Sequence, residues 1–178
     1  LQSVYVINTA SLSSGSGLVV LSCIDKINEG KDIKTILREI DFEIPKVQAS
    51  FIISNLKYLY KGGRCTAIAV FGANLLMIKP KIKLFKGKMS VDKKYMGKYQ
   101  SVVLKYVQDL LTDYKNIDKK RVFITFTTKD DELNSKISNL LKQAGFQDVI
   151  INFAGSTIAS HCGENCLGVL FQLNEDLT

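Results

Sequence analysis

Residues 121 to 153 carry the pattern that most constrains how this chain folds. A β-rich run comes first (121–127), a segment with apolar residues at helical spacing follows, and a second β-rich run ends the pattern (149–153). Gly145 supplies the stop signal between the helix and the second run. A strand–helix–strand order predicts a βαβ unit, and therefore an α/β fold with a mixed β-sheet flanked by helices. The helical stripe consists of Leu133, Ile137, Leu140 and Leu141, after an approximate capping box formed by Thr128 and Asp131.

The rest of the chain contributes further elements of both kinds. With 178 residues and 46% hydrophobic content, the sequence suits one packed domain, with room for a fragment of a second. It contains no run of about 18 apolar residues, so no membrane-spanning helix is expected. Helices are predicted over 15–28 (with a stripe of Val20, Ile24 and Ile27), 33–41, 54–61, 67–77 and 93–114, and strands over 3–8, 47–54, 76–90 (a hairpin turning at Lys86-Gly87) and 167–173.

Gly62, Gly63 and Arg64 stand between the short helical pattern that precedes them and the apolar one that follows. This arrangement places a permanent cation and two permissive backbone positions at a helix N-terminus, which favours binding of an anion. The following helix is apolar almost all round, so we expect it to be buried. The segment therefore predicts a ligand with an acidic head and an apolar body. The apolar floor is expected to comprise Ile68, Phe71, Leu75 and Leu76.

The single histidine, His161, is predicted to lie in a loop between two β-rich runs, beside Cys162 and Cys166. Such a histidine can donate hydrogen bonds to an anion, although a lone loop histidine is more often structural or solvated. The cluster has fewer ligands than the four that zinc usually takes, and a catalytic thiol requires a base nearby. We therefore predict no metal, no cofactor and no catalytic residue. Four cysteines without a signal peptide favour reduced thiols and a cytoplasmic location.

The formal net charge of +7 is concentrated in one segment. Between residues 79 and 94 there are seven lysines and one acidic residue, Asp92. One interpretation is a solvated hairpin whose lysines protect an edge strand. The other is a basic surface for a membrane, a protein partner or nucleic acid, although no aromatic platform for single strands accompanies the charges. The lysines of the hairpin proposed for membrane contact are Lys79, Lys81, Lys83, Lys86 and Lys88.

Four segments, taken in order, resemble the second half of a DegV-family protein. They are residues 6–17 (VINTASLSSGSG), residues 56–64 (LKYLYKGGR), residues 77–80 (MIKP) with the FKGK that follows at 85–88, and His161-Cys-Gly. The resemblance spans about residues 4 to 172. It implies that residues 31–178 form a DegV-like C-terminal lipid-binding domain, and that residues 1–30 are the end of a first domain or a junction. The chain starts without an initiating methionine, and its first residues have a strand-like pattern. We therefore expect the sequence to begin within a longer protein.

The resemblance also implies a function. DegV-like proteins hold one long-chain fatty acid between two domains, and some act as the non-catalytic subunit that presents the acyl carboxylate to a fatty acid kinase. Arg64 and His161 match the positions around the head group, and the first domain supplies the hydroxyl groups that complete the site. Two departures are informative. Asn8-Thr9 stands for the usual Asp-Ser, and Glu164-Asn165 stands for Pro-Gly, where asparagine can retain a turn of positive φ.

Overall fold

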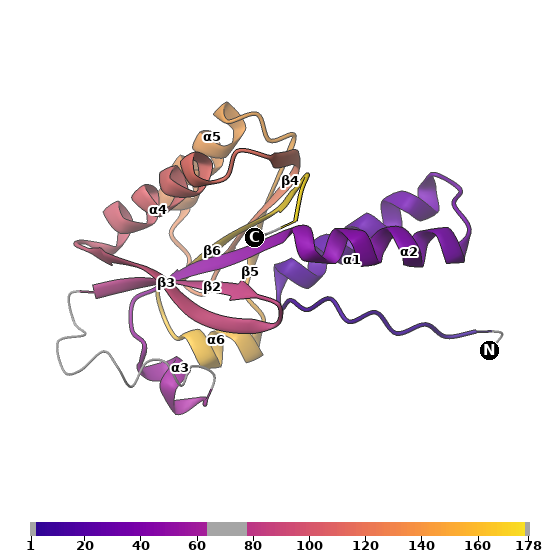
Figure 1. Cartoon of the computed structure of the whole chain (residues 1–178). Helices are drawn as coiled ribbons and strands as arrows, with labels where there is room; N and C mark the ends of the chain where they lie inside the picture. The colour runs from indigo at the N-terminus through magenta and orange to yellow at the C-terminus, as the bar shows by residue number, and fades with distance from the viewer. Residues whose placement is uncertain (1–2, 64–77, 177–178) are drawn as a thin grey trace.

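The structure, a computed structural model, describes residues 3–63 and 78–176. Within these ranges six strands form one mixed sheet with the order β3-β2-β1-β6-β4-β5, and helices pack on its faces (Figure 1). The strands are β1 (Val47–Ile53), β2 (Ile78–Phe85), β3 (Lys88–Met96), β4 (Ile117–Phe126), β5 (Asp148–Phe153) and β6 (Cys166–Leu173). The helices are α1 (Ser14–Asn28), α2 (Ile33–Glu43), α3 (Lys57–Lys61), α4 (Tyr99–Asp113), α5 (Asp131–Gln143) and α6 (Ser156–Cys162), with a 3-10 turn at Ile44–Lys46.

The predicted βαβ unit is present as β4, α5 and β5. Strands β4 and β5 pair in parallel, whereas the other paired strands are antiparallel. The helix cap differs from the prediction, because the carboxylate of Asp130 accepts the Leu133 N–H at 3.0 Å and makes Asp130 the N-cap. The expected class, an α/β fold with a mixed sheet flanked by helices, is confirmed.

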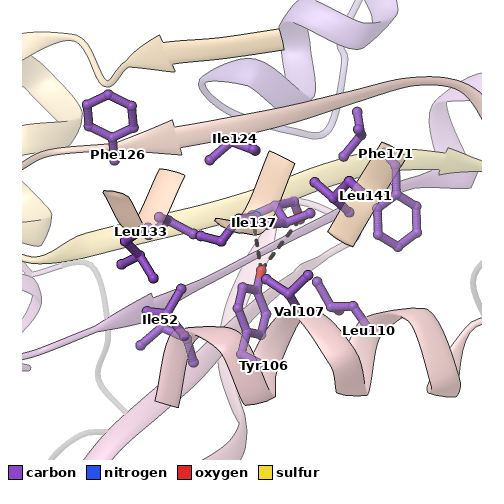
Figure 2. Close-up of a cluster of buried hydrophobic side chains, with 14 of the residues drawn as sticks. Ile52, Tyr106, Val107, Leu110, Ile124, Phe126, Leu133, Ile137, Leu141 and Phe171 are labelled. Carbon is purple, nitrogen blue, oxygen red and sulfur yellow. Dashed lines mark hydrogen bonds between the residues drawn. The ribbon is translucent and has the colours of Figure 1, made fainter. Parts of the chain in front are cut away.

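Helices α4 and α5 cover one face of the sheet with a continuous apolar core (Figure 2). Tyr106 of α4 is fully buried in it, and its hydroxyl points toward the sheet. That hydroxyl donates to the Ser50 carbonyl at 2.8 Å and accepts the Val169 N–H at 3.1 Å. The buried phenol is therefore hydrogen-bonded to two adjacent strands, β1 and β6, which fixes α4 on this face.

The opposite face carries α1, α2, α3 and α6, and the strands alternate accordingly. On β6, Leu167, Val169 and Phe171 face the α4–α5 core, while Cys166 and Leu170 belong to the clusters on the other side. Helices α1 and α2 pack over one part of that side and α3 and α6 over another. The candidate site lies on this second face.

Several predicted elements need correction. Residues 3–9 form no strand, and the predicted helix at 93–114 begins at Tyr99 because Lys93–Met96 continue β3. His161 lies on α6 instead of in a loop. The predicted helix at 67–77 lies outside the described residues. The N-terminal segment extends away from the sheet (Figure 1).

Helix α1 is helical where predicted, but its apolar stripe does not face the core. Val20 and Ile27 are 54% and 60% exposed, whereas Leu18 and Val19 are buried against the sheet and α2. Helix α1 carries apolar residues on more than one side, so their periodicity indicates a helix without fixing its rotation. The domain boundary near residue 30 stays a prediction. Of the helices described, none is both long and apolar enough to cross a membrane.

Candidate functional site

A cavity of about 620 Å³ lies between the sheet, the start of α1, and helices α3 and α6. This volume falls within the range of about 300–1,000 Å³ found for small-molecule sites. Gly168 lies in its floor, where an added Cβ would stand 3.0 Å from the Ser50 carbonyl oxygen. Because glycine has no side chain, β6 and β1 can approach closely here, and nothing at position 168 projects into the cavity. The apolar lining includes Ala49, Phe51, Leu59, Leu84, Met89 and Leu170.

The ends of α3 and α6 interlock through two glycines at one side of this cavity. A Cβ at Gly62, the residue that caps α3, would overlap the ring of His161 on α6, with Cε1 at 2.9 Å. Conversely, Gly163 follows α6 with φ of 71°, and a Cβ there would overlap the Tyr58 ring of α3. Each glycine thus makes room for a ring from the other helix, and the pair fixes the imidazole at the cavity wall.

The turn after His161 is held by hydroxyl groups from the end of β4. The Thr127 hydroxyl donates to the Gly163 carbonyl at 2.7 Å and accepts the Cys166 N–H at 3.1 Å. Asn165 has φ of 51°, and its N–H donates to the Thr128 hydroxyl at 2.9 Å. The expectation that asparagine can retain the positive-φ turn in place of the family's Pro-Gly is confirmed.

A second polar group lies where α1 begins. The buried Ser14 hydroxyl lies 2.6 Å from that of Thr125, and Thr125 donates to the Asn152 side-chain oxygen at 2.9 Å. The preceding residue, Ser13, has φ of 50° and lines the cavity. Hydrogen bonds to β4 and β5 therefore anchor the N-terminus of α1, and they hold the backbone of Ser13 in a conformation that non-glycine residues rarely adopt.

The predicted site residues separate into two groups. His161 and Gly63 line the cavity, and the imidazole of His161 lies close against Gly62. Arg64, Ile68, Phe71, Leu75 and Leu76 lie outside the described residues, so their placement stays a prediction. Sequence reasoning missed several polar lining residues, among them Thr125, Thr127 and Thr157, because single hydroxyls carry no distinctive spacing.

The cysteines beside the histidine face the same cavity. Cys162 ends α6 and Cys166 begins β6, and both are buried and line the cavity. Among the residues that the structure describes, no group of three or more potential ligands from histidine, cysteine and acidic side chains comes together to hold a metal ion.

The basic hairpin does not form one uniform charged face. Lys81 is only 3% exposed and its ammonium lies 2.7 Å from the Asp92 carboxylate. Lys93 pairs with Asp109 at 2.7 Å, and Lys79 donates to the Ser54 carbonyl at 3.4 Å. Lys86 and Lys88 are exposed at the hairpin tip. Lys81 is therefore unavailable to a membrane surface, in contrast to the expectation from the sequence.

Residues 1–174 match the family described as "uncharacterised protein, DegV family". The chain belongs to the DegV family. A DegV domain-containing protein of Clostridium acetobutylicum is 28% identical over 170 residues, which are 96% of this chain and 60% of that protein. The match confirms the resemblance on which the sequence interpretation rests.

Solved DegV structures share the fold. A fatty-acid-binding DegV family protein of Streptococcus agalactiae aligns with a TM-score of 0.75 at 26% identity, covering 96% of this chain and 60% of that one. The fatty acid kinase B3 protein of Streptococcus pneumoniae, loaded with linoleic acid, aligns with a TM-score of 0.81 at 17% identity, over 96% and 60% of the two chains. The chain spans 59% to 60% of the length of the first curated relatives that it matches.

Proposed function

We propose that this DegV-family chain binds a long-chain fatty acid in the cavity of about 620 Å³. The observation that carries the proposal is the combination of a mostly apolar cavity with a polar side chain, His161, held at its wall. Each methylene group of an acyl chain buried there contributes about 0.8 kcal/mol. The matched fatty-acid-binding protein of S. agalactiae supports the choice of ligand.

In this proposal the carboxylate lies at the His161 side of the cavity. His161 and Gly63 both line the cavity, the His161 ring lies against Gly62, and Arg64 follows Gly63 directly in the chain. The imidazole and the guanidinium would both donate to the carboxylate. The acyl chain would then extend over the floor toward Leu84 and Leu170.

The proposed role is non-catalytic. The fatty acid kinase B3 protein shares the fold, which supports a role in presenting a bound acyl carboxylate to a separate kinase. Within the described residues, the cavity lining includes a histidine, several hydroxyls and two thiols, but no acidic side chain. We place the protein in the cytoplasm because its thiols are predicted to be reduced.

Contact with an acidic surface, if it accompanies ligand exchange, would use the tip of the β2–β3 hairpin. Lys86 and Lys88 are exposed there, and Lys88 also lines the cavity. The alternative of a nucleic-acid-binding module has less support, because Lys81 and Lys93 are paired with carboxylates and no longer contribute free positive charge.

Direct titration of the purified protein with oleic acid tests the proposal. We expect saturable binding with one molecule per chain, and a weaker affinity for His161→Ala by roughly tenfold, which corresponds to about 1.4 kcal/mol. His161→Asn keeps a donor and should lose less. An absence of saturable binding by the wild-type protein would contradict the proposal.

A further inference from the structure

Cys162 and Cys166 form a pair of thiols that the proposed ligand-binding function does not use. They lie at the two ends of the short turn between α6 and β6, and both side chains belong to the same buried cluster. Both residues are 5% exposed, and both line the cavity. The two side chains thus pack in one cluster, and the cavity gives small molecules a route to them.

The two thiols have different acidities. Hydrogen bonding by the Cys166 thiol lowers the pKa of Cys162, although burial opposes this effect. The same interaction and the burial raise the pKa of Cys166. Cys162 is therefore the better nucleophile of the pair and Cys166 the neighbouring thiol that can react with its oxidised form.

We propose that Cys162 and Cys166 form a reversible intramolecular disulfide when a peroxide enters the empty cavity. The Cys162 thiolate attacks one peroxide oxygen, forming a sulfenic acid and releasing hydroxide. The Cys166 sulfur then attacks the sulfenic sulfur, and the sulfenic oxygen leaves as water. The net reaction consumes two thiols and one hydrogen peroxide and yields one disulfide and two waters. A thiol reductant reverses it by exchange.

The proposed disulfide would form beside the proposed ligand site. Cys162 follows His161 directly on the last turn of α6, and the imidazole fits closely against Gly62. Formation of an S–S bond of about 2.0 Å requires the two sulfurs to move together, which shifts that last turn. A second consequence rests on the proposed function. Because both thiols line the cavity, an acyl chain bound there would cover them and slow their oxidation.

The position of Glu164 between the two cysteines allows a direct test. The chain is treated with hydrogen peroxide, its remaining thiols are alkylated, and it is cleaved after glutamate residues. We expect the peptides ending at Glu164 and beginning at Asn165 to stay joined until a reductant is added. The variant Cys23→Ser/Cys65→Ser, which retains only this pair, should give the same joined peptides, whereas Cys162→Ser should not.

Three results would overturn the disulfide: separate peptides with both thiols still free, a sulfinic acid on Cys162 without crosslinking, or a crosslink to Cys65. The shielding is tested separately by repeating the oxidation with saturating oleic acid, after native mass spectrometry has verified that the acid is bound. Slower crosslinking in the loaded protein supports shielding, and an unchanged rate overturns it. A protein that binds no oleic acid but crosslinks would contradict the proposed function alone.

Discussion

The imidazole of His161 occupies the space that a side chain at Gly62 would need. The two residues are 99 positions apart, yet the ring lies so close to the glycine that an added Cβ would overlap its Nδ1 and stand 2.9 Å from its Cε1. The backbone of Gly62 has φ of −77° and ψ of −2°, which any residue can adopt. The requirement for glycine is therefore steric and comes from the histidine.

Gly62→Ala should accordingly destabilise the protein by about 1–3 kcal/mol, the usual cost of overpacking. In a double-mutant cycle, His161→Ala should remove most of that cost because it removes the ring. Urea unfolding of the four proteins measures both effects. An alanine at position 62 that costs the same with and without the histidine ring would show that the two residues do not compete for space.

Thr127→Val should loosen the turn that follows His161. The substitution keeps the shape of the side chain but leaves the Gly163 carbonyl and the Cys166 N–H without their partner, at a cost of about 1–3 kcal/mol. Thr128→Val is the matched control. It removes only the exposed bond from the Asn165 N–H and should cost less. Equal losses in thermal unfolding for the two variants would contradict this ranking.

Ile158→Trp should shorten the acyl chain that the cavity accepts. Ile158 lies on α6 and lines the cavity, so the larger ring would fill part of it. Because each buried methylene contributes about 0.8 kcal/mol, excluding two of them should weaken binding by roughly tenfold or more. The control Ile151→Trp makes the same change on β5 at an exposed position that is not among the cavity-lining residues. Fatty acids of graded length, titrated against both variants, reveal whether only the first discriminates by length.

The contacts of Asp25 allow a prediction of how the stability of the folded protein changes at acidic pH. Arg121 donates to both carboxylate oxygens of Asp25 at 2.6 and 2.7 Å, and Lys120 adds a third bond, so these contacts between α1 and β4 hold the pKa of Asp25 well below its usual range. A depressed pKa in the folded state contributes stability above the unfolded value near 4, and that contribution is lost as the pH falls below it.

Asp25→Asn should therefore cost about 1.5–3 kcal/mol at neutral pH, the range for hydrogen bonds to charged groups. The difference from the wild type should shrink as the pH is lowered below about 4. Urea unfolding at several pH values measures this difference. The prediction is contradicted if the difference in free energy of unfolding between the two proteins stays constant down to strongly acidic pH. The ionised Asp25 carboxylate would then not contribute the expected pH-dependent stability.

The elements that were predictable from the sequence are those with a strong local signal. The β4–α5–β5 unit combines helical spacing, a glycine stop and two β-rich runs, and the Lys86-Gly87 dipeptide marks the β2–β3 turn. Helix α6 was missed because it is short and has no apolar stripe to distinguish it from a loop. The rotation of α1 was missed because two of its sides are apolar, and contacts with the sheet and α2 choose between them.

The candidate site was predictable only in its parts. Gly62, Gly63 and His161 were singled out from composition and from family resemblance, but their meeting depends on the packing of α3 against α6. The threonine at 127 was not predicted, because its role comes from the turn it holds. Tertiary contacts between distant segments create these requirements, and local sequence patterns do not report them.

Native mass spectrometry of the purified protein, followed by identification of any released lipid, tests the central claim most directly. The account predicts one fatty acid per chain, retained in the native spectrum and released on denaturation, with less retained by His161→Ala. A wild-type protein that carries no lipid and remains unliganded after incubation with oleic or palmitic acid would contradict it.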